Sequence, residues 1–122
     1  MLKRKILSTF GFFITLSAAL CLSSCGLNAN DYQKRLEKKD YEVRIKYFDK
    51  DSDSEYEWKL DAVKIHTHGV ENVTIIQYYD QKDAVDYEKV YRELIGEEEG
   101  FWRVEARVFY GTKQGVKDAR FV

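Results

Sequence analysis

The fold is decided by residues 41–47, Tyr41-Glu42-Val43-Arg44-Ile45-Lys46-Tyr47, in which apolar and charged side chains alternate without a break. Successive side chains of a β-strand point to opposite faces, so this alternation predicts a strand with one buried side and one solvent-facing side. The buried side is expected to carry Tyr41, Val43, Ile45 and Tyr47. A strand of this kind is typical of an antiparallel sheet that packs on one face and meets water on the other.

The next strand is expected over residues 56–67, but its apolar phase changes along the way. The apolar positions are Tyr56, Trp58 and Leu60 in the first half and Val63, Ile65 and Thr67 in the second. A bulge or break near Asp61–Ala62 would keep both halves on one buried face. A short helical turn over Ser54–Leu60 is the alternative.

A first helix is expected before these strands. It begins at Asn30 or Asp31, which can cap it, and ends near Lys39, with Tyr32 and Leu36 on its buried face. Its other side chains are mostly basic: Gln33, Lys34, Arg35, Glu37, Lys38 and Lys39. Close to a membrane such a helix could lie against anionic head groups; a solvated helix face is the alternative.

A second helix is expected after the strand Val73–Tyr79. Asp80 can cap it, with Asp83 as a capping partner, and Gly96 can end it. Its buried stripe is formed by Ala84, Tyr87, Tyr91 and Leu94, with Val90 and Ile95 beside them. The spacing of three and four residues is that of one helix face.

The remaining elements complete an α+β fold. A hairpin turn is expected over residues 68–72, a last strand over Trp102–Val108, and a short terminal helix after Thr112. That helix would bury Val116 and Ala119. The order is α-β-β-β-α-β-α, which predicts a single small domain with an antiparallel sheet of about four strands and helices on one face.

The composition excludes some classes of protein. The chain has 20 basic and 21 acidic side chains and a net charge of −1, which argues against nucleic-acid binding. Its two cysteines are Cys21 and Cys25, and both belong to the N-terminal segment. If that segment is processed as described next, no disulfide can form within the mature chain, and stability depends on packing.

The N-terminal segment differs from the rest of the chain. The basic residues Lys3, Arg4 and Lys5 precede the uncharged apolar run Ile6–Leu22. The run is near the lower limit of about 17–25 residues for a bilayer-spanning helix, so its length fits both a cleaved signal and an uncleaved signal anchor. It ends in Leu22-Ser23-Ser24-Cys25, an aliphatic and two small residues before a cysteine.

Residues 1–25 resemble the signal peptide and lipobox of bacterial lipoproteins, although Ser24 stands where Gly or Ala is more common. The resemblance implies cleavage after Ser24, a diacylglyceryl group on Cys25 and attachment to the extracytoplasmic face of the cell membrane, or to the outer membrane in a Gram-negative cell. It divides the chain into a signal peptide (1–24), a lipidated N-terminus with a spacer (25–30) and an α+β domain (31–122), and it makes the membrane a partner through Cys25.

Two stretches of the expected domain, Tyr79–Tyr91 and Phe109–Ala119, resemble small lipoproteins of Gram-positive bacteria. In the first stretch, a helix that starts at an aspartate follows a strand. In the second, the turn Tyr110-Gly111-Thr112 leads into the last helix. Both features are found in that group of lipoproteins. No activity is attached to that group, so the resemblance implies none.

His66 and His68 are candidate metal ligands, because residues two apart on a strand point to the same face. Two imidazoles can occupy two positions of a zinc or copper site, with Glu71 as a third ligand. If Val63 and Ile65 face inward, however, the histidines lie outside beside Lys64, whose positive charge disfavours a metal. A metal-handling lipoprotein is therefore the alternative hypothesis.

Other catalytic and ion-binding patterns are incomplete. Asp49, Asp51 and Asp53 have the alternate spacing of a calcium loop, but Ser54 replaces the required glycine and Leu60 the bidentate glutamate. The sequence has neither a Gly-x-Ser-x-Gly elbow nor a phosphate-binding glycine loop. We expect a protein that is not an enzyme and has no cofactor.

Basic side chains are expected to gather on the sheet face away from the helices. They are Arg44, Lys46, Lys64, Arg103 and Arg107, together with the two histidines, and Glu42 and Glu105 offset them in part. Such a face can receive an anionic envelope polymer or an acidic protein surface, although a one-sided sheet also needs charge to stay soluble. The sequence thus predicts a non-enzymatic interaction or structural module at the cell envelope.

Overall fold

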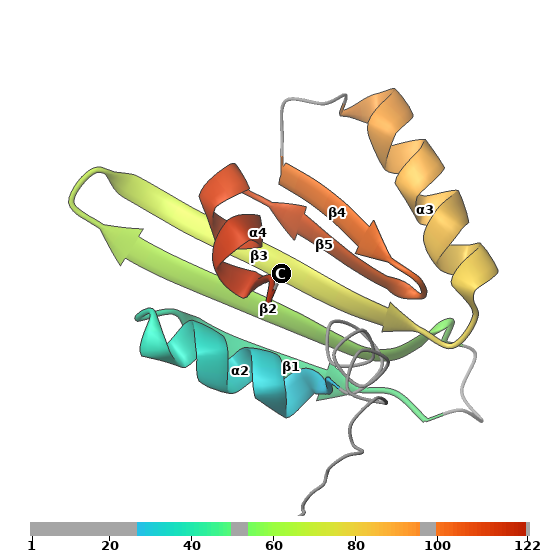
Figure 1. The fold of residues 1–122 in the computed structure, drawn as a ribbon, viewed down its shortest axis with the longest axis horizontal. Coiled ribbons are helices and arrows are strands. Elements are labelled where there is room, and N and C mark those ends of the chain that lie inside the picture. Colours follow the sequence, from blue (N-terminus) through green and yellow to red (C-terminus); the bar gives the residue numbers. More distant parts are fainter. Residues whose placement is uncertain (1–26, 50–53, 96–99, 122) are drawn as a thin grey trace, which may run out of the picture.

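The computed structural model describes residues 27–49, 54–95 and 100–121, and this part of the chain forms an α+β fold (Figure 1). Its helices are α2 (Ala29–Lys38), α3 (Gln81–Leu94) and α4 (Lys113–Ala119). Its strands are β1 (Glu42–Tyr47), β2 (Tyr56–His66), β3 (Gly69–Tyr78), β4 (Gly100–Val104) and β5 (Arg107–Gly111). The predicted signal segment and Cys25 lie outside the described residues. None of the helices in the described ranges has the length and apolar character needed to cross a bilayer.

The strands form one antiparallel sheet in the order β1-β2-β3-β5-β4. One row of paired residues crosses the whole sheet and shows how its core is built. The row runs through Ile45, Leu60, Ile75, Phe109 and Trp102, each opposite the next. Leu60, Ile75 and Phe109 are fully buried. The predicted α+β class and antiparallel sheet are therefore confirmed.

Helices cover both faces of the sheet, so the prediction of helices on one face is wrong. In Figure 1, α2 and α4 lie in front of the strands, and their side chains pack around the row just described. We call this side the α2/α4 face. On the opposite side, the α3 face, a second cluster contains Ile76, Tyr78, Ala84 and Val108. The neighbours Ile75 and Ile76 are both buried, which is possible only where both sides of a strand are covered.

The single last strand expected over Trp102–Val108 is also wrong, because a tight turn divides it into β4 and β5. Val104 pairs with Arg107, so the turn consists of Glu105 and Ala106. Glu105 has a φ of 53°, in the left-handed region that most residues avoid. The apolar alternation continues through the turn, so the sequence pattern hides it. The sheet therefore has five strands in the described ranges, not four.

β2 is continuous where a bulge near Asp61–Ala62 was expected, and the helical alternative over Ser54–Leu60 is wrong as well. The register shift lies instead between Tyr56 and Trp58. Trp58, Leu60 and Ala62 are all buried, whereas Ile65 is 80% exposed. The expectation that Val63 and Ile65 face inward is therefore wrong. The hairpin turn is shorter than residues 68–72, because His66 already pairs with Gly69.

Helix α2 begins earlier than predicted, because its cap is Asn28. The Asn28 side chain accepts a hydrogen bond from the Asp31 backbone N–H, and the Asp31 carboxylate accepts one from the Asn28 N–H at 2.8 Å. This reciprocal pair satisfies two donors at the helix start. Tyr32 and Leu36 are buried, as predicted.

The other two helices follow the prediction at their starts. Thr112 caps α4 by accepting a hydrogen bond from the Gly115 N–H at 3.1 Å, and Val116 and Ala119 are buried. Asp80 stands at the N-cap of α3, although its side chain makes no cap hydrogen bond within the described part of the chain. Leu94, expected in the buried stripe of α3, is 77% exposed.

Candidate functional site

The predicted basic face does not exist as one surface, because its five cations lie in separate surroundings. Arg44 and Lys46 lie on the α3 face of β1, where Arg44 is opposite Asp61 and Lys46 is opposite Lys59. Lys64 lies on the other face, and its ammonium group is 5.7 Å from the centre of the Tyr41 ring. Arg103 and Arg107 are held by hydrogen bonds to other parts of the fold.

Arg107 is a buried structural residue, with 8% of its surface exposed. Its Nε donates to Gln77 Oε1 at 2.6 Å, Nη1 to the Tyr32 hydroxyl at 2.8 Å, and Nη2 to the Leu27 carbonyl at 2.9 Å. The guanidinium also lies over the rings of Tyr32 and Trp58, at 5.2 and 5.4 Å. Arg107 therefore joins β5 to β3, to α2 and to Leu27, the residue before the Asn28 cap of α2.

The turn between β4 and β5 explains why Arg107 points inward. Val104 and Arg107 pair across the two-residue turn, and side chains of paired residues point to the same face of a sheet. Arg107 therefore shares the α2/α4 face with Phe109, and Val108 lies on the α3 face. Burial is the largest effect on Tyr32 and raises the pKa of its hydroxyl, while Arg107 acts in the opposite direction. Tyr32 thus stays neutral and accepts the hydrogen bond.

Arg103 attaches α3 to β4 through Glu88. Arg103 Nε donates to Glu88 Oε1 at 2.7 Å, and Arg92 donates to Glu88 Oε2 at 3.2 Å. The hydrogen bond from Arg103 is the main cause of a lowered pKa of the Glu88 carboxyl, and the hydrogen bond from Arg92 acts in the same direction. Both oxygens of the Glu88 carboxylate therefore accept hydrogen bonds from arginines. Arg103 links α3 to β4 and does not belong to an open basic surface.

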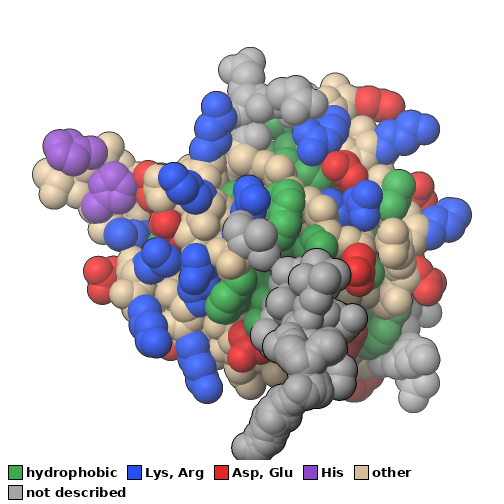
Figure 2. Space-filling view, in the orientation of Figure 1, with side chains coloured by type: hydrophobic (Ala, Val, Ile, Leu, Met, Phe, Trp, Pro, Cys, Tyr) green, Lys and Arg blue, Asp and Glu red, His purple; other side chains and the backbone are tan. Residues whose placement is uncertain are grey.

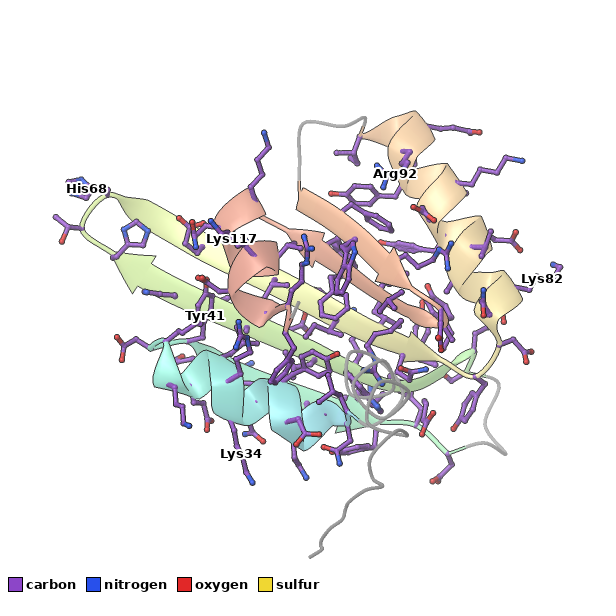
Figure 3. All side chains as sticks on the ribbon, in the orientation of Figure 1. Lys34, Tyr41, His68, Lys82, Arg92 and Lys117 are labelled. Carbon is purple, nitrogen blue, oxygen red and sulfur yellow. The ribbon has the colours of Figure 1, made fainter. Side chains whose placement is uncertain are left out.

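The two histidines lie at the end of the β2–β3 hairpin, where Figure 3 labels His68. His68 is in the turn, so the two side chains do not share a strand as expected. His66 Nδ1 accepts the backbone N–H of His68 at 3.2 Å, which assigns the ring proton to Nε2. That nitrogen is 3.3 Å from the Glu71 carboxylate and donates to it.

This arrangement uses both ring nitrogens of His66. Glu71 has a lowered pKa, first because of a hydrogen bond from the Thr112 side chain and then because of the bond with His66. No group of three or more histidine, cysteine, aspartate or glutamate side chains in the described ranges is arranged to hold a metal ion. A metal site at His66 and His68 stays a prediction, and Asp51 and Asp53 of the calcium-loop pattern lie outside the described residues.

The structure contains a candidate binding groove that the sequence did not predict. It lies along α3 and has a volume of about 510 Å³. Tyrosines from α3 and β3 line it together with aliphatic side chains of α3, and carboxylates stand at its rim. The lining residues are Glu55, Tyr78, Asp83, Asp86, Tyr87, Val90, Tyr91, Leu94 and Ile95.

The groove combines tyrosine side chains with an exposed aliphatic edge. Tyr78 is 5% exposed and its ring contacts that of Tyr87 at 6.4 Å. Val90, Leu94 and Ile95 are 53%, 77% and 48% exposed. The sequence signal for this groove was the apolar stripe of α3, which is wider than the face that the sheet can cover.

Comparisons of the chain with known protein families, with curated proteins and with solved structures find no match.

Proposed function

We propose that the chain is a lipoprotein, anchored through a diacylglyceryl group on Cys25, which binds a partner at the extracytoplasmic face of the membrane and catalyses no reaction. The anchor is supported by the order of Lys3–Lys5, the apolar run Ile6–Leu22 and the cysteine that follows two small residues. Two acyl chains on one residue give firm membrane attachment, whereas a single chain is marginal.

The α3 groove is the observation that carries the binding role. Grouped aliphatic side chains on the surface of a monomer mark interaction sites more often than isolated ones do. Three of them, Val90, Leu94 and Ile95, are exposed beside the buried Tyr78 and the half-buried Tyr87 and Tyr91. A partner that covers these side chains removes their apolar surface from water, which favours binding.

The rim of the groove indicates the chemistry of that partner. Glu55, Asp83 and Asp86 are acidic, and of these Asp86 is 3.2 Å from Lys82 of the same helix. A protein segment that inserts apolar side chains and carries Lys or Arg at its flanks would match both the apolar lining and the acidic rim. The partner is thus a basic, amphipathic segment of an envelope protein.

The anchor is tested by replacing Cys25 with Ser in the full chain. We expect the wild-type protein to be found in the membrane fraction with acyl mass on its N-terminal cysteine. Cys25→Ser should lose that mass and the cleavage after Ser24. A wild-type protein with an unmodified Cys25 would contradict the proposed anchor.

The binding role is tested by co-purification from solubilised envelopes. The double variant Val90→Ser, Leu94→Ser removes the exposed aliphatic edge, and Lys89→Ser, Glu93→Ser changes the neighbouring positions of the same helix as a matched control. A partner that is retained by the wild type and the control, but lost by the groove variant, is the expected result. Equal retention by all three proteins would remove the groove from the proposal.

A further inference from the structure

The position of the first described residue fixes how near the domain lies to its proposed anchor. The Leu27 carbonyl accepts a hydrogen bond from the buried Arg107 at 2.9 Å, and the next residue, Asn28, caps α2. The backbone is therefore held in place two residues after Cys25. Two extended residues span at most about 7 Å, so a lipid on Cys25 would keep the start of α2 at the surface of the bilayer.

Helix α2 is asymmetric in charge. Lys38 follows Lys34 by four residues and Arg35 by three, so these three side chains share one side of the helix, which Lys39 extends. Glu37, three residues after Lys34, borders this side, and its carboxylate accepts a hydrogen bond from the Gln33 side chain at 3.3 Å. In Figure 3 the side chain of Lys34 points away from the domain.

A further acidic residue shares the basic side of α2, and its charge is already in use. Asp31 belongs to the capping pair with Asn28, where its carboxylate accepts a backbone N–H at 2.8 Å. A carboxylate in the first turn also interacts with the positive end of the helix dipole. Figure 2 shows that Lys and Arg side chains outnumber acidic ones over the lower left of this view, where Figure 1 places α2.

An aromatic side chain completes this surface. Phe121 is 42% exposed, and its ring lies 5.4 Å from the Tyr32 ring and 4.8 Å from the Arg35 guanidinium. Together with α2 it borders a hollow of about 500 Å³, lined by Leu27, Asp31, Lys34, Arg35, Lys38, Lys39 and Phe121. Aromatic rings beside Lys and Arg are the side chains that proteins present to the head-group region of a bilayer.

We propose that the surface formed by Lys34, Arg35, Lys38, Lys39 and Phe121, the anchor-side surface, docks against anionic phospholipid head groups. The bilayer is the one in which the Cys25 lipid is inserted, so the inference rests on the proposed anchor. The short tether and the complementary charge favour this occupant over a soluble one. Because α3 covers the opposite face of the sheet, its groove would then point away from the membrane, towards partners.

The test measures lysine reactivity in the full, lipid-modified protein. The purified protein is placed in vesicles of phosphatidylcholine, or of equal parts phosphatidylcholine and phosphatidylglycerol, and treated with an amine-acetylating reagent. Mass spectrometry then gives the rate at each lysine. We expect Lys34, Lys38 and Lys39 to react roughly fivefold more slowly in the anionic vesicles, the factor that corresponds to the usual attraction per basic residue. Lys46 and Lys89, on the other face, should keep their rates.

A charge-reversal pair separates docking from a general loss of exposure. Lys34→Glu, Lys38→Glu should abolish the protection of Lys39 in anionic vesicles. Lys46→Glu, Lys89→Glu makes the same change in net charge on the other face and should leave that protection intact. Circular dichroism of both variants checks that the fold is retained.

The other outcomes each count against a defined part of the proposal. If the N-terminal peptide carries no acyl mass, the proposed anchor fails. If it does and the lysines react equally in both vesicles, the docking inference fails while the anchor stands. Protection by inorganic phosphate or a soluble polyanion, without anionic vesicles, would assign the surface to a free anion and overturn docking to the bilayer.

Discussion

At the scale of single residues, Arg107 shows how a charged side chain is accommodated in the interior. Three of its nitrogens donate to oxygens of Gln77, Tyr32 and Leu27, and two aromatic rings lie on its guanidinium. These oxygens would be left without their donor if the guanidinium were removed, and a buried acceptor without a donor costs free energy. Arg107 thus stabilises the folded structure.

This role predicts a stability loss that a surface arginine would not show. Arg107→Met keeps most of the aliphatic stem but removes the donors, so we expect the free energy of unfolding to fall by about 2–3 kcal/mol. Arg44→Met, at an exposed position of β1, should change it by less than about 0.5 kcal/mol. Chemical denaturation of both variants gives the comparison. Equal midpoints would contradict the structural role of Arg107.

At the scale of elements, α4 is fixed to the sheet by close backbone contact with β3. The Thr112 N–H donates to the Asn72 carbonyl at 3.0 Å, and the Asn72 N–H donates to the Thr112 hydroxyl at 3.2 Å. Gly115 lies over the same peptide, so closely that a Cβ there would overlap the Asn72 carbonyl. A helix this near the strand tolerates only glycine at that position.

Gly115→Ala should therefore destabilise the protein, although alanine normally favours a helix by about 1 kcal/mol over glycine. We expect a loss of about 1–3 kcal/mol from the forced separation of α4 and β3. Lys113→Ala, at an exposed position of the same helix, serves as the control and should be nearly neutral. Thermal or urea unfolding measures both, and a more stable Gly115→Ala protein would exclude this close packing.

The attachment of α3 to β4 predicts a dependence of stability on pH. The hydrogen bonds from Arg103 and Arg92 lower the pKa of Glu88 from its usual 4.5 in the folded state. A carboxyl with a lowered pKa in the folded state stabilises the fold fully above its unfolded pKa, and the stabilisation disappears as the pH falls through the folded value.

Glu88→Gln should thus cost about 1 kcal/mol at neutral pH, since Glu88 is partly exposed and solvent screens the pair. The difference from the wild type should shrink as the pH falls from 4.5, the usual pKa, through the lowered pKa of the folded carboxyl. Unfolding curves at several pH values provide the measurement. A difference that stays constant down to strongly acidic pH would show that Glu88 contributes through shape and not through charge.

At the scale of the whole molecule, the domain is stabilised by two apolar clusters on either side of one sheet. The first centres on Tyr32, Leu60 and Phe109, and the second on Ile76 and Tyr78. Both cysteines of the sequence, Cys21 and Cys25, precede the described residues. Packing across two faces therefore takes the part that disulfides take in many small secreted domains.

The midpoint of thermal unfolding should accordingly be the same with and without a thiol reductant. The measurement uses the protein purified from membranes in detergent, because the proposed processing at Cys25 would consume the thiol that could otherwise pair. A midpoint that falls by several degrees in reductant would mean that a disulfide supports the fold and that Cys25 is not modified. An unchanged midpoint is the expected result.

The sequence by itself determined the features that depend on local periodicity. The alternation of Tyr41–Tyr47 predicted β1, although Tyr47, expected on the buried side, is 61% exposed. The spacing of Tyr32 and Leu36 predicted the buried face of α2, and Thr112 predicted the start of α4. These follow from neighbours a few residues apart, since strand and helix geometry repeat over that distance. The lipobox pattern is local in the same sense, and it remains the basis of the proposed anchor.

Only the tertiary structure decided which face each side chain occupies. The two-residue turn at Glu105 shifts the alternation of side chains by one residue, and as a result Arg107 points inward. Because β2 is unbroken, Lys64 and His66 lie on the α2/α4 face. A shift of one residue reverses every side chain that follows it, and a pattern that stays apolar through the shift gives no sign of it. For that reason the expected basic face does not form. The α3 groove and the anchor-side surface each consist mainly of one helix, whose pattern is visible in the sequence, and the fold adds Tyr78 to the first and Phe121 to the second.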